Sequence, residues 1–214
     1  MKLQRRRFLH LRKIARNQCK PARDRRRAEW GLDRWYPKRR GRLLPTRLGN
    51  SIRAFEEHSN VRWGLDGVTI WPRIEALLSS DERELLVDAK INLYVFLNGS
   101  VGAVVLGTCL VVDQAVYGAR PTWVWALLTI PFVVSYALYR ASVGPAIDWG
   151  SVVRASIDLH RPELYAKLGV RTPVCFTDER KIALRVNQLL LYGRPPLPDS
   201  LWGASQNDSQ KSKA

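Results

Sequence analysis

The chain contains two apolar stretches that hold no charged residue, INLYVFLNGSVGAVVLGTCLVV at residues 91–112 and PTWVWALLTIPFVVSYALY at residues 121–139. As α-helices they would be roughly 33 Å and 28 Å long, and the hydrocarbon core of a bilayer is about 30 Å thick. The helices of a soluble core are usually amphipathic, whereas these stretches are apolar on all sides. We therefore predict two transmembrane helices, joined as an antiparallel hairpin by a short extracytoplasmic loop at residues 113–120.

The distribution of Lys and Arg predicts how this hairpin is oriented. The connecting loop holds Arg120 alone, whereas the outer flanks hold a larger set, Arg73, Arg83, Lys90, Arg140 and Arg154. Basic residues close to membrane spans are retained on the cytoplasmic side. Both termini are therefore expected in the cytoplasm.

Two features of the stretches predict how the helices are shaped and packed. Pro131 lies near the middle of the second stretch and predicts a kink there. In the first stretch small residues recur at every fourth position, at Gly99, Ala103 and Gly107. Such a stripe lets another helix approach closely. This helix is either the second span or a helix of a second copy of the chain.

The N-terminal part of the chain is strongly basic. The formal net charge is +16, and almost all of this excess lies within residues 1–50. We predict that residues 1–42 form a basic arm that is largely disordered or lies on the membrane surface. Phe8, Leu11 and Ala15 are spaced to share one face of a helix, and the surrounding Lys and Arg would attract anionic lipid headgroups.

Two alternatives are open for this arm. It can bind nucleic acid without sequence specificity, with Trp30, Trp35 and Tyr36 stacking on bases. It can also be a solvated tail without a partner. We favour the membrane surface, because tethering of the chain to a bilayer already places the arm beside anionic lipid.

We predict a small helical module on the cytoplasmic side, packed beneath the hairpin and formed by residues 43–90 and 140–193. Ser79 and Glu82 match a capping box, so a helix is expected to begin just after Ser79 and to continue into the bilayer. The other expected boundaries are a helix opened by Pro72, an interruption at Gly144 and Pro145, a turn starting at Pro162 and a helix capped by Thr177. The polar residues 194–214 are expected to be disordered.

Residues 44–74 read LPTRLGNSIRAFEEHSNVRWGLDGVTIWPRI and resemble a motif of uncharacterised integral membrane proteins of bacteria, actinobacteria especially. The shared residues are 44–50 (LPTRLGN), Arg53 and Ala54, Glu56, 64–66 (GLD), Val68 and 71–73 (WPR). The likeness extends over residues 40–190 and includes the hairpin. It implies a multi-pass protein of the bacterial inner membrane, but no activity, because none is assigned to this family. Since its members carry further membrane helices before the basic segment, the resemblance implies an N-terminally shortened member.

Motifs that would indicate a reaction are not found in the sequence. It has no phosphate-binding glycine loop, nucleophile elbow or zinc-protease motif. The spacing typical of metal ligands is also missing from the cysteines and histidines, Cys19, Cys109, Cys175, His10, His58 and His160. We interpret the histidines as solvated or capping residues. We predict no catalytic residue, no cofactor and no metal site, and no transport by this chain alone, because neither stretch holds an ionisable side chain.

Three polar residues of the shared motif stand out, Arg47, Asn50 and Arg73. A structural role is favoured for them, with Asn50 capping a helix. Arg47 would then pair with Glu56 or Asp66. The functional alternative is that Arg47 and Arg73 together bind a phosphate or a lipid headgroup.

The favoured hypothesis for function is a structural or regulatory component that acts through protein partners at the cytoplasmic membrane face. The partner would be another membrane protein or a second copy of this chain. One alternative is nucleic-acid binding by the basic arm. A second is a membrane enzyme acting on lipid headgroups, with Asp148, Arg154 and Asp158 as its candidate polar residues.

Overall fold

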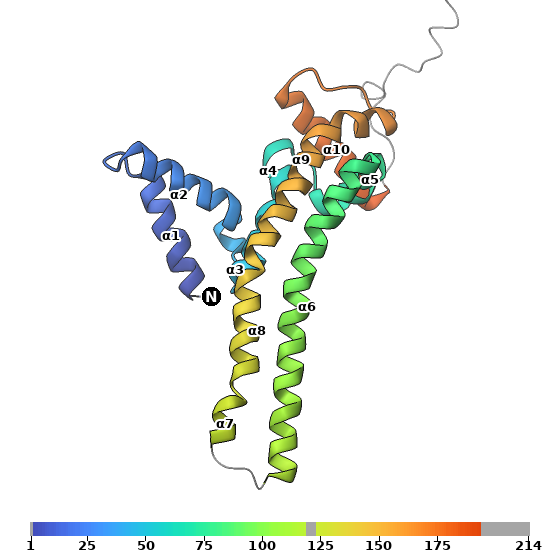
Figure 1. The fold of residues 1–214 in the computed structure, drawn as a ribbon. Coiled ribbons are helices and arrows are strands. Elements are labelled where there is room, and N and C mark those ends of the chain that lie inside the picture. The colour runs from blue at the N-terminus through green and yellow to red at the C-terminus, as the bar shows by residue number, and fades with distance from the viewer. Residues whose placement is uncertain (1, 119–122, 194–214) are drawn as a thin grey trace, which may run out of the picture.

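The structure, a computed structural model, describes residues 2–118 and 123–193. All regular elements in these ranges are helices, so the prediction of an all-α protein is confirmed (Figure 1). Figure 1 shows two parts, which we call the stem (residues 91–118 and 123–141) and the head (residues 2–90 and 142–193). The end of the predicted loop, the first residues of the second apolar stretch and the predicted C-terminal tail lie outside the described residues.

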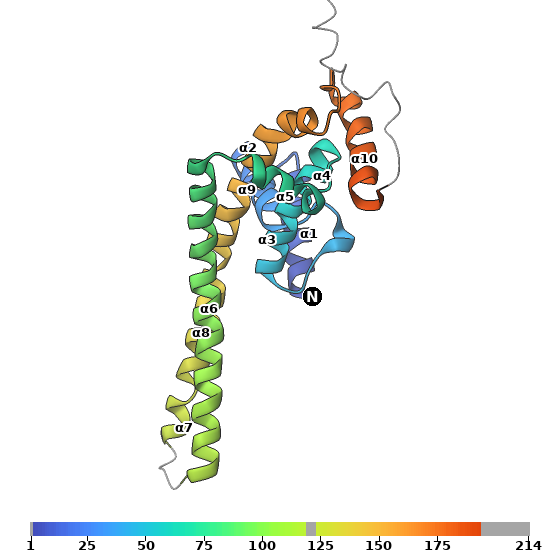
Figure 2. The ribbon, with the colours of Figure 1, turned by 90° about the vertical axis from the view of Figure 1, so that its right-hand side faces the viewer.

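The head contains α1 (Lys2–Arg16), α2 (Ala22–Trp35), the 3-10 helix η1 (Arg40–Arg42), α3 (Arg47–Glu56), α4 (His58–Trp63), α5 (Gly67–Leu77) and α10 (Phe176–Tyr192). The stem contains α7 (Trp123–Leu127) and α8 (Ile130–Ala141). Two long helices connect the parts: α6 (Ser80–Tyr117) runs from the head down the stem, and α9 (Val143–Lys167) continues from α8 into the head (Figures 1 and 2).

The predicted capping box at the start of α6 is confirmed. The Ser79 hydroxyl accepts a hydrogen bond from the Glu82 backbone N–H (3.3 Å), and the Glu82 carboxylate accepts one from the Ser79 backbone N–H (2.9 Å). These bonds satisfy donors that the first turn of a helix leaves free. From there α6 is unbroken to Tyr117, beyond the predicted start of the loop at Asp113.

The run of helices from α7 through α8 to α9 is broken at other positions than predicted. Pro131 lies in the first turn of α8, so the break precedes it, where Pro cannot continue the hydrogen bonding of α7. Gly144 and Pro145 do not interrupt the helix but lie in the first turn of α9, where a backbone N–H needs no helical partner. Pro162 likewise lies inside α9 and does not start a new turn. The boundary between α8 and α9 is the single residue Ser142.

The start of α5 also differs from the prediction. The helix begins at Gly67, because the Asp66 carboxylate accepts a hydrogen bond from the Thr69 backbone N–H (3.2 Å) and caps it. Pro72 therefore lies inside the helix instead of opening it. Asp66 is the N-cap of α5 and Gly67 is its first residue.

The helix α10 packs beside the loop between α4 and α5. Its N-cap position is Cys175 and not the predicted Thr177. Its Asn187 side chain donates to the Gly64 carbonyl (2.7 Å) and accepts from the Asp66 backbone N–H (3.0 Å). The loop between α4 and α5 is thus held to α10 by hydrogen bonds that replace missing backbone partners.

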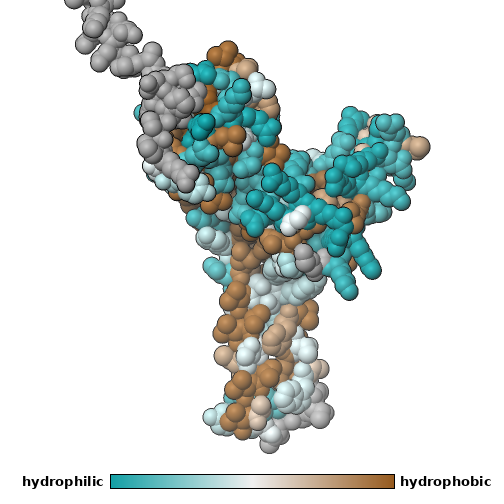
Figure 3. Space-filling view, turned by 180° about the vertical axis from the view of Figure 1, so that it is seen from behind, coloured by the Kyte–Doolittle hydropathy of each residue, from teal (hydrophilic) through white to brown (hydrophobic). Residues whose placement is uncertain are grey.

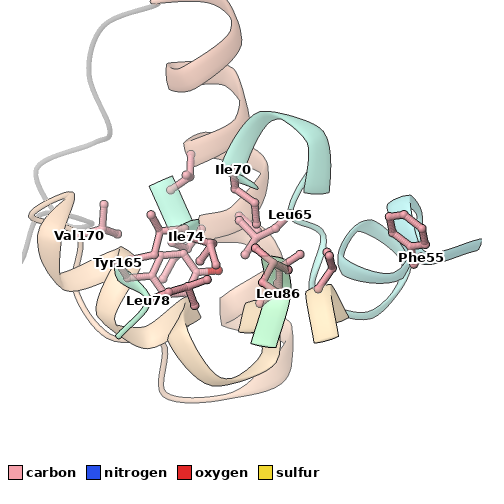
Figure 4. Packing of buried hydrophobic residues seen from close by; sticks show 14 residues of the cluster. Phe55, Leu65, Ile70, Ile74, Leu78, Leu86, Tyr165 and Val170 are labelled. Atoms are coloured by element: carbon pink, nitrogen blue, oxygen red, sulfur yellow. The ribbon is translucent and has the colours of Figure 1, made fainter. Parts of the chain in front are cut away.

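The head has one main hydrophobic core (Figure 4). Its buried residues come from two segments that are distant in the sequence: Phe55, Leu65, Ile70, Ile74, Leu78, Leu86, Val153, Ile157, Leu164, Tyr165, Val170, Ile182, Ala183 and Val186. Figure 4 shows Tyr165 against Ile74 and Leu78. Burial of this apolar surface is the main free energy that holds α9 and α10 to α3, α5 and the start of α6.

A second cluster joins head and stem. Leu48 of α3 packs with Leu93, Val143 and Ala146, all of them buried. Because Leu48 is in the first turn of α3, this helix begins beside the end of the stem. The position of α3 is therefore set by contacts with both long helices.

The basic arm is helical where the structure describes it, which corrects the prediction of disorder. Phe8 of α1 packs edge to face on Tyr36, with ring centroids 5.6 Å apart, and the Tyr36 hydroxyl donates to Gln4 (3.1 Å). Phe8, Tyr36 and Leu43 are buried together. The apolar face of α1 predicted to lie on lipid is therefore used for packing against residues that follow α2.

The two stem segments pack antiparallel. Gly99 of α6 faces Leu138, and Gly107 faces Phe132, so positions that increase along α6 meet positions that decrease along α8. Between them the Ser100 hydroxyl donates to the Ser135 carbonyl (3.0 Å). Two members of the predicted stripe of small residues thus lie against α8.

We expect Gly107→Val to destabilise the pairing of α6 with α8. A Cβ at this position would lie 3.0 Å from Cε2 and Cζ of Phe132, so the larger side chain forces the helices apart at a cost of about 1–3 kcal/mol. The control is Gly102→Val, because a Cβ on Gly102 meets no atom within 4 Å. Thermal unfolding in detergent micelles measures the difference, and equal midpoints for the two variants would contradict the packing.

A matched pair in α9 tests the head. A Cβ on Gly150 would lie 2.9 Å from Cγ of Phe55, whereas one on Gly144 meets nothing within 4 Å. We expect Gly150→Ala to lower the free energy of unfolding by about 1–3 kcal/mol. Gly144→Ala should be neutral or stabilising by up to about 1 kcal/mol, since Ala favours the helix. Chemical denaturation followed by circular dichroism measures both free energies of unfolding. If Gly144→Ala lowers this free energy as much as Gly150→Ala does, the close packing of Gly150 on Phe55 is refuted.

Candidate functional site

The stem exposes apolar side chains around its surface. Two helical segments, Ser80–Tyr117 and Val124–Lys167, are long and apolar enough to cross a membrane, and their most apolar 18-residue windows have mean hydropathies of 2.1 and 1.4. Only 11% and 22% of their most apolar windows is buried. Figure 3 shows hydrophobic side chains along the stem and hydrophilic ones over the basic helices of the head. Exposed apolar stem residues include Val95, Val101, Val105, Leu106, Val112, Val133 and Tyr136. A continuous surface of this kind marks a contact with lipid or with another protein.

The residues of the shared motif have structural partners that differ from the predicted ones. Asn50 does not cap α3; the Thr46 hydroxyl does, accepting from the Gly49 backbone N–H (3.1 Å). The fully buried Asn50 side chain instead accepts from the Leu44 backbone N–H (2.7 Å) and donates to the Leu44 carbonyl (2.9 Å). It therefore fixes the turn that leads into α3, where a smaller or apolar residue would leave backbone groups unpaired.

Arg47 and Arg73 lie on different helices. The Arg47 guanidinium lies 4.5 Å from the centroid of the Trp35 ring, a cation–π contact, and pairs with neither Glu56 nor Asp66, the two predicted partners. Arg73 donates to the Thr69 carbonyl (2.9 Å) on the exposed side of α5. Within the described residues these two arginines share no partner, so their joint binding of one headgroup stays a prediction without a contact to support it.

A polar pocket of about 330 Å³ lies where α2, α4 and α9 meet. Its lining comprises Asp33, Lys38, Ala54, His58, Val61, Arg62 and Arg154. Arg154 and Asp158 are one helical turn apart on α9, so their side chains share one face of the helix. Two of the three residues proposed for a lipid-active site are thus brought together, whereas the third, Asp148, is exposed at another position of α9.

Asp158 is held by side chains of α4. The Trp63 indole donates to its Oδ1 (2.6 Å), and the His58 Nε2 lies 3.2 Å from its Oδ2. The Arg62 guanidinium lies 4.0 Å away. The pKa of His58 is nevertheless below its ordinary value, because burial, Arg154 and Arg62 disfavour the charged ring more than Asp158 favours it. The interpretation of His58 as a solvated or capping residue is therefore wrong.

Arg154 is the least satisfied charged group of this pocket. Its side chain is 15% exposed, and its ion pair in the described structure is with Asp33, at a long 3.7 Å. The buried Nε of the guanidinium has no hydrogen-bond partner. Asp33 is shared, because its other oxygen pairs with Lys38. Burial lowers the pKa of Arg154, which is the sign of a cation with incomplete compensation.

A second ionic group lies beside the pocket. The Arg161 guanidinium stacks on the Trp63 ring, 3.2 Å from its centroid, and its Nε lies 2.9 Å from Oε1 of Glu179. Burial raises the pKa of Glu179 although Arg161 lowers it. Since Glu179 belongs to α10, this pair connects α9 to α10 through a nearly buried contact.

His160 connects α9 to the start of α6. Its Nε2 lies 2.9 Å from Glu82 Oε1, and its Nδ1 lies 3.4 Å from Glu163 Oε2. The hydrogen bond to Glu82 raises the pKa of His160 despite partial burial. In turn, His160 and Ser79 lower the pKa of Glu82 to about 2. His160 is therefore also a bonded residue and not a solvated one.

Sequence reasoning had no signal for most of this arrangement. The partners His58 and Asp158 are 100 positions apart in the chain, so no local sequence motif can reveal that they meet. The part of the chain that the structure describes has no group of three His, Cys, Asp or Glu placed to hold a metal ion. No protein-family model, curated protein or solved structure matches this chain.

The pair of His160 and Glu82 makes the stability of the head depend on pH. Folding raises the pKa of His160. The stabilisation that the charged ring adds to the free energy of unfolding is therefore complete below about pH 6.5 and is lost as the pH rises through the raised pKa. Glu82, whose pKa is lowered to about 2, loses its contribution as the pH falls from about 4.5 toward that value. We expect Glu82→Gln, which keeps the capping box, to return the pKa of His160 toward about 6.5.

NMR titration of the His160 ring in the detergent-solubilised chain measures this shift. The matched control is Glu163→Gln, which removes the longer contact and should lower the pKa of His160 less. A His160 midpoint that does not change in Glu82→Gln would show that the contact is not formed in solution.

Proposed function

We propose that this chain is an integral protein of the bacterial inner membrane, with the stem across the bilayer and both ends in the cytoplasm. The observation that carries the proposal is the apolar surface of the stem, which two helices alone cannot hide from water. The proposed orientation follows the excess of Lys and Arg on the head side of both helices. The location agrees with the resemblance of residues 44–74 to the bacterial membrane proteins described above.

The lower side of the head is suited to lie on anionic headgroups. Leu48 packs on Leu93 and Val143 at the end of the stem, which brings the neighbouring Arg47 to the same level. In Figures 1 and 2 the beginning of α1 lies at about the same level along the stem axis as this junction. Each Lys or Arg close to an anionic surface contributes about 1 kcal/mol. Arg73 is less suited to this role, because α5 ends next to the start of α6, on the side away from the stem.

For its role in the membrane, we propose a structural or regulatory component that acts through protein partners. The support is a small, well-packed head that joins a membrane anchor to an exposed cytoplasmic surface. Binding of nucleic acid through stacked aromatics is less well supported by the geometry. Tyr36 is buried and Trp35 is covered by Arg47, so Trp30 is the exposed member of the three. An enzyme acting on headgroups is also less well supported, because Asp148 lies apart from Arg154 and Asp158.

Fractionation of cells tests the membrane proposal. We expect the chain to sediment with membranes, to resist extraction by high salt and to require detergent for release, because salt screens charges but does not hydrate the apolar stem. Release by high salt would instead favour a peripheral protein that binds nucleic acid or lipid through its basic helices.

The native cysteines test the orientation. Cys19 and Cys175 lie in the head, and Cys109 lies in α6 within the stem, all three exposed. In single-cysteine variants we expect a membrane-impermeant maleimide to label neither head cysteine in intact spheroplasts and both after lysis. Cys109 should react only after detergent is added. Labelling of Cys109 in membranes without detergent, or of Cys19 in intact spheroplasts, would contradict the proposed placement.

A further inference from the structure

We propose that the pocket between α2, α4 and α9 binds the phosphate group of a phosphate-bearing compound, with Arg154 at its base and Arg62 and Lys38 at its mouth. Arg62 and Lys38 side chains are 57% and 54% exposed, whereas Arg154 is 15% exposed. A guanidinium on the inner side and more exposed cations at the opening are suited to draw an oxyanion inward. Binding by the pocket does not depend on where the stem lies.

The unmet donors of Arg154 point to the class of ligand. A guanidinium carries five N–H donors in a planar fork that matches two oxygens of a phosphate or carboxylate. In the described structure its one carboxylate partner is Asp33, beyond hydrogen-bond distance and engaged by Lys38. A buried donor without a partner costs about 1–3 kcal/mol, and a bound oxyanion would remove this cost.

The charge around the pocket favours phosphate over a carboxylate. Four cations act on this region, Lys38, Arg62, Arg154 and Arg34, the last of which acts on Arg154. The two carboxylates are Asp33 and Asp158, and Asp158 is already bonded to Trp63 and His58. The cations thus exceed the carboxylates by two charges, which a dianionic phosphate monoester balances and a single carboxylate does not.

The size of the pocket leaves room for more than inorganic phosphate. A volume of about 330 Å³ is at the lower end of the range found for small-molecule sites. Ala54 and Val61 supply apolar wall beside the cations. The phosphate would therefore belong to a small organic compound or to a lipid headgroup.

The position of the pocket favours a water-soluble compound, and this preference rests on the proposed membrane placement. Arg154 lies about 18 Å along α9 from Ser142, where the stem ends, and the headgroup layer is only about 5–8 Å thick on each side. A phospholipid would have to leave the bilayer to reach Arg154. Both sources share the same phosphate chemistry, so the experiment has one arm for each.

Thermal unfolding of the full chain in neutral detergent tests binding, with sodium phosphate compared with sodium chloride at equal ionic strength. We expect phosphate to raise the midpoint of unfolding in a saturable way. Arg154→Gln should weaken the phosphate response about tenfold, because the paired guanidinium donors are lost. The control is Arg185→Gln, an exposed position on α10, which should respond as the unchanged chain does.

Equal phosphate responses in Arg154→Gln and Arg185→Gln would overturn the proposal, because the anion would then bind elsewhere on the basic surface. If Arg154→Gln does not fold, the largely exposed Arg62→Gln decides, and an unchanged response in this variant also overturns it. The second arm uses vesicles of phosphatidylcholine with either phosphatidic acid or phosphatidylglycerol. If vesicles with phosphatidic acid abolish the stabilisation by phosphate and those with phosphatidylglycerol do not, the source is a lipid headgroup. If phosphate still stabilises the chain in both kinds of vesicle, the source is a soluble compound.

Discussion

Two helices cannot bury each other's apolar surface when both are apolar on all sides, and the whole arrangement of this protein follows from that constraint. Small residues let α6 and α8 approach closely at Gly99 and Gly107, yet most of the stem surface stays exposed. Only lipid or a large protein partner can cover it. The head is consequently attached at one end of the stem, where α6 and α9 leave the apolar region and acquire polar and amphipathic partners.

The helix α9 carries most of the architecture of the head. Gly150 allows α3 to approach, and Val153 and Ile157 enter the main core. On another face of the same helix, Arg154 lines the polar pocket and Asp158 binds Trp63 and His58 of α4. Because its faces contact α3, α5, α6 and the basic arm, α9 has no single apolar stripe, and its pattern alone does not reveal which residues meet.

Several features were predictable because they depend on near neighbours in the chain. The capping box at Ser79 needs only Glu82, and the end of α10 needs only Gly193, which adopts a left-handed conformation. Boundaries at proline were less predictable. Pro72 and Pro162 lie inside helices because tertiary packing on both sides compensates for the missing backbone hydrogen bond.

Composition alone identified two helices long and apolar enough to cross a membrane, because hydropathy is a sum over local residues that needs no knowledge of the fold. Only the tertiary structure decided that the basic arm packs as α1 and α2 through Phe8 and Tyr36. It also decided that Arg154 faces His58 and Asp33 across a pocket. Such contacts join residues far apart in the chain, and they arise when separate apolar faces are buried together, an event that no local pattern encodes.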